Sequence, residues 1–378
     1  MASYIRGEYL MSSKILIIGA GITGLTLAAL LERQGMVAEV VEKAEDWSQL
    51  GYGITVMPAG LKIARKLQLI QKLRDFGSSA NTFHFLSPSG DIIREVKLKT
   101  GGVDSITLSR NDLHSSILEK LTSTVIRMGT QVINIEETGS AVQVTFSDGT
   151  TVEYGLVIGA DGLRSATRGM LFSNSEYEVT GAAIWTFFLP PGIKLPDHKS
   201  VLQVWDKNEF MGVFPCKSSA AVTFSAVLGP DEDLAHFDLK KHFANISFLG
   251  KDIVKAMQTE NTYAGLVSQV SIRNWYKGRV LLAGDAAHAM VPATGMGASM
   301  GMVDAETIAE LIRATPISEW SSIPKRYQKK RKFAVDTIQK EAYLVGRMMF
   351  LGSPAKEVRN ELIRLVPQFV VTHQLNLK

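Results

Sequence analysis

The sequence predicts an α/β fold in which a parallel sheet and its helices carry an inserted, mostly antiparallel β domain, with further helices near the C-terminal end. Three observations predict this arrangement. A glycine-rich turn at residues 19–24 stands between an apolar run and a helical run. Two later glycine-acid motifs, at 159–168 and 284–288, also follow short apolar runs. The segments at 82–104 and 176–272 alternate apolar and polar residues as half-buried strands do.

The first glycine turn has the spacing of a Rossmann-like, dinucleotide-binding unit. Residues 14–18 form a β-branched apolar run, typical of a parallel strand that is buried on both faces. Gly19 permits the tight turn, Gly21 lets a pyrophosphate approach the backbone, and Gly24 lets the following helix pack closely on the strand. Glu42 ends the second strand, where a carboxylate can accept hydrogen bonds from the hydroxyls of an adenosine ribose.

Composition and charge exclude several classes of protein. The chain has 378 residues, of which 46% are hydrophobic, so two or three domains with large cores are expected. A formal net charge of +4 is too small to indicate a nucleic-acid partner. Cys216 is the single cysteine, which excludes an intramolecular disulfide and favours a reducing, cytoplasmic location. No apolar run reaches the roughly 18 residues that a transmembrane helix needs.

The three motifs together carry a family resemblance. They read Gly19-Ala-Gly-Ile-Thr-Gly24, Gly159-Ala-Asp-Gly-Leu-Arg-Ser-Ala-Thr-Arg168 and Gly284-Asp-Ala-Ala-His288. Their order and spacing resemble those of the group A flavoprotein monooxygenases, the family of para-hydroxybenzoate hydroxylase, from about residue 14 to about residue 331. The resemblance implies bound FAD, with NADPH or NADH as a transient reductant. It also implies that one oxygen atom of O₂ passes, through a flavin C4a-hydroperoxide, to an aromatic or polycyclic small molecule.

The resemblance also implies which residues contact FAD. Arg110 matches an arginine that reaches toward the flavin, and Asp285 matches an aspartate that holds a ribityl hydroxyl. Asp161 would bind FAD, and the region of Arg168 would also help to receive the nicotinamide. The expected cofactor-binding residues are Gly19, Gly21, Gly24, Glu42, Arg110, Asp161, Gly162, Arg168, Gly284, Asp285, Pro292, Gly295, Met296, Gly297 and Ala298.

The loop that begins at Pro292 is expected to position the flavin. Gly295 and Gly297 allow the backbone to lie against the isoalloxazine edge, and the helix that follows places its positive N-terminal end there. No side chain is assigned as a catalytic acid or base. The family usually has GQGxN where this chain has Gly295-Met-Gly-Ala-Ser299, so Met296 replaces a polar side chain. We expect Met296 to point toward the substrate or the flavin.

The inserted β domain is expected to cover the substrate. Its aromatic side chains either line the pocket or pack in the core, and four are taken as candidates for the pocket: Trp185, Phe187, Phe210 and Phe224. The histidines have no acidic or cysteine partners at metal-ligand spacing, so no metal is expected. His288 is interpreted as part of the framework rather than as a proton-transfer group.

The chain divides into three expected parts, with residues 1–10 as a disordered leader or tag. The FAD-binding domain comprises 11–81, 105–175 and 273–320, the substrate-binding domain 82–104 and 176–272, and the C-terminal helices 321–378. A monomer or a weak homodimer is expected. The basic run at 325–332 is interpreted as a solvated helix face. An attraction of this basic run to NADPH phosphates or to an anionic membrane surface is the alternative.

Other functions remain open at the level of the sequence. Flavin-dependent halogenases share the first motif, although the segment Trp185-Thr-Phe-Phe-Leu-Pro190 lacks their WxWxIP signature. Flavin-dependent alkene reductases share the fold, and only their chemistry separates them. A flavin-bound protein that sequesters a ligand without turnover is the non-enzymatic alternative, which oxygen uptake with NAD(P)H would distinguish.

Overall fold

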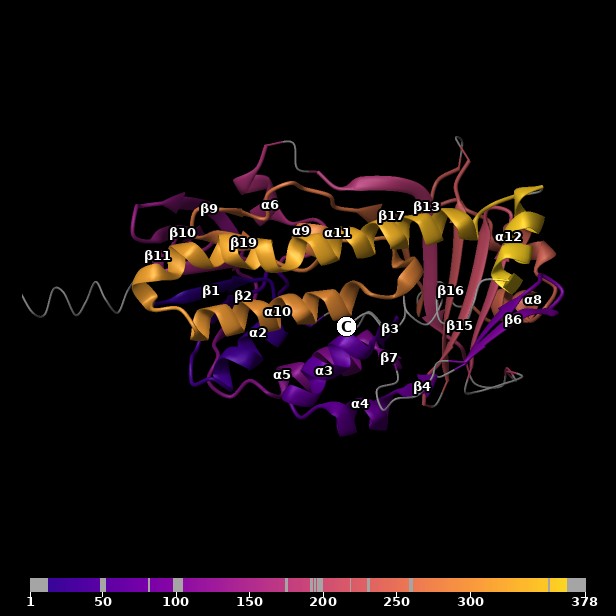
Figure 1. Ribbon diagram of the computed structural model, residues 1–378, viewed down its shortest axis with the longest axis horizontal. Coiled ribbons are helices and arrows are strands. Elements are labelled where there is room, and N and C mark those ends of the chain that lie inside the picture. The colour runs from indigo at the N-terminus through magenta and orange to yellow at the C-terminus, as the bar shows by residue number, and fades with distance from the viewer. Residues whose placement is uncertain are drawn as a thin grey trace, which may run out of the picture.

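The computed structural model describes residues 13–47, 52–80, 82–97, 105–173, 176–190, 193, 195, 200–217, 219–229, 232–257, 261–352 and 354–365. Figure 1 shows two main sheets side by side along the longest axis: the sheet that contains β1 and β2, and the sheet that contains β13, β15 and β16. Residues 1–10, expected to be a leader or tag, lie outside the described residues.

The first of these, the parallel sheet, has six strands in the order β18–β19–β12–β1–β2–β8. The strands are β1 (Ile15–Ile18), β2 (Glu39–Val41), β8 (Ile126–Arg127), β12 (Leu156–Gly159), β18 (Tyr276–Lys277) and β19 (Val280–Leu282). Neighbours pair in parallel, except that β18 is antiparallel to β19. Every residue of β1 and β12 is buried, which explains why both strands are unbroken apolar runs.

The first glycine turn connects β1 to helix α2 (Ile22–Glu32). Gly19 has a φ of +102°, a conformation that other residues rarely adopt. A Cβ atom on Gly24 would lie 2.0 Å from the carbonyl oxygen of Gly19, so any other residue would push α2 away from the turn. Helix α10 (Gly297–Arg313) packs against α2 and brings the third motif to the same end of the sheet.

Two small antiparallel sheets extend this half of the molecule. One has the order β11–β10–β9, from Thr151–Tyr154, Val142–Phe146 and Val132–Glu137. The other has the order β3–β7–β4, from Gly53–Val56, Ser105–Ser109 and Ser78–Ala80. A Cβ on Gly53 would lie 2.2 Å from the Cβ of Ala221, so β3 lies directly against the second main sheet.

The second main sheet, which we call the inserted sheet, has seven strands in the order β17–β13–β16–β15–β14–β5–β6. They are β5 (Thr82–Leu86), β6 (Ile92–Lys97), β13 (Glu178–Phe188), β14 (Ser200–Asp206), β15 (Glu209–Pro215), β16 (Ala220–Val227) and β17 (Tyr263–Gln269). All neighbours are antiparallel except β14 and β5. Its outer face packs on α7 (Leu239–His242), η1 (Phe243–Asn245) and α8 (Gly250–Ala256), and its inner face is turned toward β3.

The remaining helices connect and border these sheets. They are α3 (Pro58–Lys66), α4 (Ile70–Phe76), α5 (Arg110–Leu118), α6 (Ala166–Leu171), α9 (Asp285–His288), η3 (Pro292–Thr294), η4 (Ile317–Ser322), α11 (Ile323–Met349) and α12 (Ala355–Leu365). Figure 1 shows α11, in orange to yellow, crossing the molecule from the parallel sheet to the inserted sheet. Across the described residues, no helix has the length and apolar character to span a membrane.

Candidate active site

The first glycine turn and the end of β2 are joined by the side chain of Glu42. The carboxylate of Glu42 accepts hydrogen bonds from the backbone N–H groups of Ala20, at 2.9 Å, and Ala44, at 3.0 Å. No described protein atom lies within 4 Å of the position that a Cβ on Gly21 would occupy. An acidic side chain and an unobstructed backbone therefore stand together, as the adenosine and pyrophosphate parts of a dinucleotide require.

His114 of α5 supports this turn and was missed by sequence reasoning. Its Nε2 lies 2.8 Å from the carbonyl oxygen of Ala20, and its ring lies 4.8 Å from that of Trp47. Burial lowers the pKa of His114, and the charge of Arg110 lowers it further, against the opposing hydrogen bond to Ala20. Because a carbonyl oxygen only accepts hydrogen bonds, the Nε2–H of His114 donates to the turn. A single histidine within a helix carries no sequence signal for this contact.

The third motif places Asp285 at the N-terminal end of α10. The Oδ1 of Asp285 lies 4.0 Å from the position of a Cβ on Gly297, and Gly295, with a φ of +64°, is exposed beside it. The side chain of Asp285 is accessible, but burial within the surrounding protein raises the pKa of its carboxyl group, against the charges of His288 and Arg110. An accessible carboxylate in enclosed surroundings is typical of a residue that faces a deep cleft.

Asp304 of α10 holds the third motif in place, and sequence reasoning did not identify it. Its side chain is 0% exposed and accepts hydrogen bonds from the backbone N–H of Gly284 at 3.0 Å, from His288 Nε2 at 2.5 Å and from Arg331 Nε at 2.7 Å. Burial would raise the pKa of Asp304. The charge and hydrogen bond of His288, together with Arg331, instead hold it well below its usual range.

This network corrects the interpretation of the basic run on α11. Arg331 and Tyr327 are buried, and Arg331 pairs with Asp304 in the interior, so these two residues do not belong to a solvated face. The period of the helix explains the difference, because residues four apart point to the same side while the lysines between them point outward. His288 occupies the framework position that the sequence predicts, bound to Asp304 and packed 4.9 Å from the ring of Trp275.

The second motif joins the other two. The carboxylate of Asp161 accepts hydrogen bonds from the hydroxyls of Ser165 and Thr167 and from the backbone N–H of Thr167, at 2.6–2.9 Å, and so fixes the start of α6. Arg168 is 3% exposed and donates to the carbonyl oxygens of Leu163 and Ala286. Both side chains are bound within the protein, and the expectation that the region of Arg168 helps to receive the nicotinamide stays a prediction. A direct contact of Asp161 with FAD stays a prediction.

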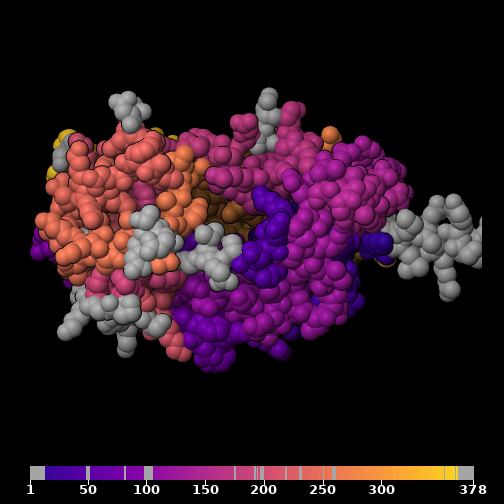
Figure 2. Space-filling model, turned by 180° about the vertical axis from the view of Figure 1, so that it is seen from behind, coloured from indigo at the N-terminus to yellow at the C-terminus, as the bar shows by residue number. Residues whose placement is uncertain are grey.

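Arg110 connects the parallel-sheet half to the inserted sheet through two tyrosines. Its guanidinium lies 5.8 Å from the ring centre of Tyr52, and the rings of Tyr52 and Tyr263 are 5.1 Å apart. Burial raises the pKa of Tyr52, and the charge of Arg110 opposes that shift. The charge of Asp285 also raises the pKa of Tyr52, so Arg110, Tyr52 and Asp285 border one region. Figure 2 shows the surface hollowed near the middle of the molecule, with orange atoms of the C-terminal third at its floor.

The aromatic candidates for the substrate pocket divide between the two faces of the inserted sheet. Trp185, Phe187 and Phe224 are buried on the outer face, where they pack with the helices that carry Leu239 and Phe243. Their assignment to the pocket is therefore wrong. Successive side chains of a strand point to opposite faces of the sheet, so every second residue of these strands faces the outer helices instead of the pocket.

Phe210 lies on the inner face, but it packs with Trp205 and Met349 at the end covered by α11. The inner face also carries a row of directly paired residues that sequence reasoning missed. The row crosses six strands in the order Phe85, Gln203, Gly212, Thr223, Thr186 and Tyr263. Thr223 donates to the hydroxyl of Thr186 at 3.3 Å, and Gln203 accepts from the indole N–H of Trp205 at 3.0 Å. Neutral polar groups therefore stand in the centre of an aromatic surface.

Met296 does not point toward the substrate. It is 3% exposed and packs in an apolar cluster with Met57, Met300 and Ile338, which corrects the expectation from the sequence. Met57 is a member of the same cluster although it is distant in sequence. The flanking glycines turn the backbone outward at Gly295, so the side chain of the next residue enters the core.

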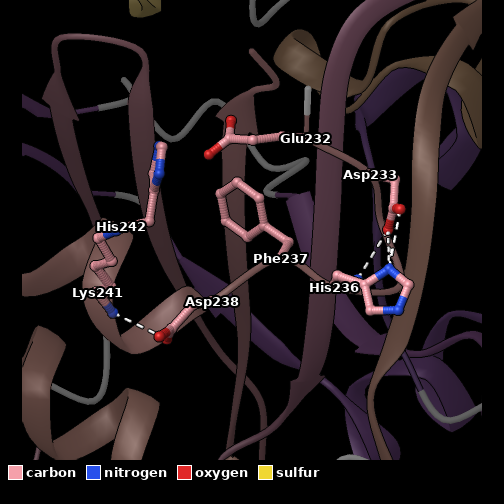
Figure 3. Close-up of a pocket in the computed structure, with 7 residues that line it drawn as sticks. All are labelled: Glu232, Asp233, His236, Phe237, Asp238, Lys241 and His242. Carbon is pink, nitrogen blue, oxygen red and sulfur yellow. Dashed lines mark hydrogen bonds and ion pairs between the residues drawn. The ribbon is translucent and has the colours of Figure 1, made fainter. Parts of the chain in front are cut away.

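A separate depression of about 390 Å³ lies on the outer side of the inserted sheet. Figure 3 shows its lining: Glu232, Asp233, His236, Phe237, Asp238, Lys241 and His242. Phe237 stacks on Trp185 at 4.6 Å, and Trp185 belongs to the outer face, so this depression is separated from the glycine motifs by the sheet. His236 pairs only with the neighbouring Asp233 among the residues drawn. We assign it no part in the chemistry of the motifs.

Comparison with known proteins identifies the family. A family model described as an FAD binding domain matches residues 12–353. The chain belongs to this FAD-binding family. It is 30% identical, over 364 residues, to 2-heptyl-3-hydroxy-4(1H)-quinolone synthase of Pseudomonas aeruginosa, covering 93% of this chain and 94% of that one. It is 27% identical to 6-hydroxynicotinate 3-monooxygenase of Pseudomonas fluorescens, covering 80% and 83%.

Solved structures agree on the fold. Klebsiella pneumoniae HpxO complexed with FAD and uric acid superposes with a TM-score of 0.88 at 22% identity, over 96% of this chain and 95% of that one. The tetracycline destructase Tet(51) superposes with a TM-score of 0.74 at 24% identity, over 97% and 99%. The chain is an FAD-dependent monooxygenase, as its three motifs predict. The open backbone at Gly21 and Gly295 and the carboxylates of Glu42 and Asp285 fit this cofactor.

Proposed function

We propose that this monooxygenase hydroxylates an uncharged, nitrogen-containing heteroaromatic molecule with electrons from NADH or NADPH. The inner face of the inserted sheet carries the proposal. Apart from the exposed Glu178 at the start of β13, which accepts a hydrogen bond from Gln269, the inward positions of the described parts of β5 and of β13 to β17 hold aromatic, aliphatic and neutral polar side chains. Burying a charged substrate group without an opposite charge is costly, so this face favours a neutral ring.

Arg94 of the edge strand β6 is the nearest cation to this row by strand pairing. It pairs with Phe85, and its guanidinium donates to the carbonyl oxygens of Ile363 and Arg364 at the end of α12. Because the guanidinium N–H groups of Arg94 bind these backbone carbonyls, they support a structural role for Arg94 and not a role in pairing with a substrate charge. One relative is named as the synthase of a quinolone and another as a monooxygenase of 6-hydroxynicotinate, a pyridine carboxylate. Both names contain a nitrogen heterocycle, which supports that ring class here, and the inner face of the sheet is the argument for an uncharged one.

Each part of the site has a proposed task. Glu42 and the backbone at Gly21 hold the adenosine and pyrophosphate groups, and Asp285 with the N-terminal end of α10 holds the flavin end. Bound FAD supplies electron transfer from the nicotinamide to O₂ and oxygen transfer to the substrate. The aromatic inner face excludes water, and Thr223 and Gln203 orient the ring by neutral hydrogen bonds.

The proposal is tested with matched pairs of heterocycles that differ by one carboxylate, such as 4-quinolones and hydroxypyridines with and without it. We expect the uncharged member of a pair to stimulate oxygen uptake with NAD(P)H, and ¹⁸O₂ to place one labelled atom in the product. Label from water alone, or a reduced product without oxygen, would contradict hydroxylation. Preference for the carboxylated members would contradict the assigned substrate class while leaving hydroxylation intact.

Thr223→Val tests the role of the inner row in substrate binding. We expect KM for the heterocycle to rise about 3- to 10-fold, corresponding to the loss of one neutral hydrogen bond, while FAD affinity stays the same. The matched control is Thr145→Val, because Thr145 makes the same kind of cross-strand bond, to Thr151 at 3.2 Å, in the sheet of β9 to β11. Equal KM values for both variants would remove Thr223 from the site.

A further inference from the structure

Helix α11 exposes a stripe in which apolar and cationic side chains alternate. The stripe consists of Lys329, Lys330, Phe333, Lys340, Leu344 and Arg347. Phe333 is 85% exposed and Leu344 is 60% exposed, although both belong to a helix whose other face is buried along most of its length. At 100° per residue, Phe333 and Leu344 lie on nearly one line, with the four cations within about 60° on either side.

The charge of this surface has one sign. Among the described residues of α11, those that are exposed include Lys325, Arg326 and the four cations of the stripe, and none is an aspartate or glutamate. Asp336 is half-buried and pairs with Lys332 at 3.0 Å, and Glu341 is half-buried. A second copy of the chain would place cations against cations, so symmetric self-association through the stripe is disfavoured.

We propose that the α11 stripe docks the enzyme on an anionic lipid surface, with α11 lying in the plane of the headgroups. Phosphate groups pair with the lysines and the arginine, and Phe333 and Leu344 enter the boundary between headgroups and acyl chains. Long lysine side chains reach the headgroups while their methylene stems lie along the apolar line. A soluble phosphate ligand would account for the cations and not for two exposed apolar side chains between them.

The length and position of α11 fit this arrangement. The helix has 27 residues, so it extends about 40 Å, and it crosses from the parallel sheet to the inserted sheet in Figure 1. One straight contact therefore positions both halves of the enzyme relative to the lipid. The proposal is independent of the substrate, because the stripe contains none of the residues that form the site.

Co-sedimentation of the FAD-loaded full-length enzyme with vesicles tests the proposal, with flavin absorbance as the readout. We expect sedimentation with equimolar phosphatidylglycerol and phosphatidylcholine and not with phosphatidylcholine alone. About 1 M NaCl, where the Debye length is about 3 Å, should release most of the enzyme. We expect Lys329→Glu/Lys330→Glu to lower vesicle affinity at least about tenfold, and Phe333→Ser/Leu344→Ser also to lower it.

The matched control is Lys240→Glu/Lys241→Glu, which makes the same change of net charge at two adjacent exposed lysines of α7. We expect this variant to sediment like the wild type. All variants should keep FAD and the wild-type unfolding temperature, because the substituted side chains are exposed. Equal affinities of the two charge variants would overturn the proposal, as would unchanged affinity of the Phe333/Leu344 variant. Absence of wild-type sedimentation would also overturn it, and is the result expected if an acidic protein binds this face.

Discussion

Asp304→Ala is expected to lower the free energy of unfolding by about 3–5 kcal/mol, the cost of breaking a buried charge network by removing one partner. Arg331 would remain buried without its carboxylate, and the backbone N–H of Gly284 and the imidazole of His288 would each lose an acceptor. Urea denaturation of the FAD-loaded enzyme measures the change. Because Gly284 precedes Asp285, weaker FAD binding should accompany the loss of stability.

Glu310→Ala is the control for this prediction. Glu310 lies on the same helix and pairs with Lys66 at 3.6 Å, with both side chains about half exposed. Exposed ion pairs contribute about 0–1 kcal/mol, so this variant should unfold almost like the wild type. Equal losses for the two variants would show that the Asp304 network contributes no more than a surface pair.

The pH dependence of the Asp304 effect has a definite sign. The pKa of Asp304 is held below its unfolded value of about 3.9, so the folded state favours the ionised carboxylate. Its contribution to stability is present above that pH and is lost as the pH falls toward the folded pKa. The stability that ionised Asp304 contributes to the wild type relative to Asp304→Asn should therefore shrink below about pH 4.

Asp285→Ala is expected to weaken FAD binding by about 10- to 150-fold, or about 1.5–3 kcal/mol, by removing one charged hydrogen bond to the ribityl chain. The structure places this carboxylate, accessible and near Gly297, at the start of α10. Flavin titration of the apoenzyme measures the effect. His288→Ala should change FAD affinity less and stability more, because His288 bonds to Asp304 in the interior. The reverse order would contradict the assignment of the third motif.

Local backbone features explain how much of the fold the sequence could predict. A strand that ends in Gly19 and continues into a close-packed helix has a steric requirement that the residues themselves display. The position of Glu42 follows from the same unit, because the acid ends the next strand and reaches back to Ala20. The resemblance of all three motifs then led to FAD and oxygen transfer, which the family match confirms.

The pocket could not be predicted in the same way. Trp185 and Phe210 are both aromatic residues in strands whose sequences alternate apolar and polar residues. Nothing in those sequences shows that Trp185 lies on the face that packs on helices and Phe210 on the face turned toward β3. Which residues of a strand face inward is decided by the register with its neighbouring strands, such as the pairing of Thr223 with Thr186. Met296 was misplaced because its partners Met57 and Ile338 come from distant segments.

The sequence by itself determined the glycine turns, the acids that follow the strands and, through them, the cofactor and reaction class. Tertiary structure decided which polar side chains form hydrogen bonds and ion pairs with one another. Asp304 shares α10 with Glu306 and Glu310, and its full burial is tolerable only because α9 and α11 bring His288 and Arg331 to it. Conversely, Phe333 has the composition of a core residue and becomes a surface feature because α11 turns it away from both sheets. Backbone constraints act between neighbours in the chain, whereas the partners of a buried charge or an exposed ring are set by how the elements pack.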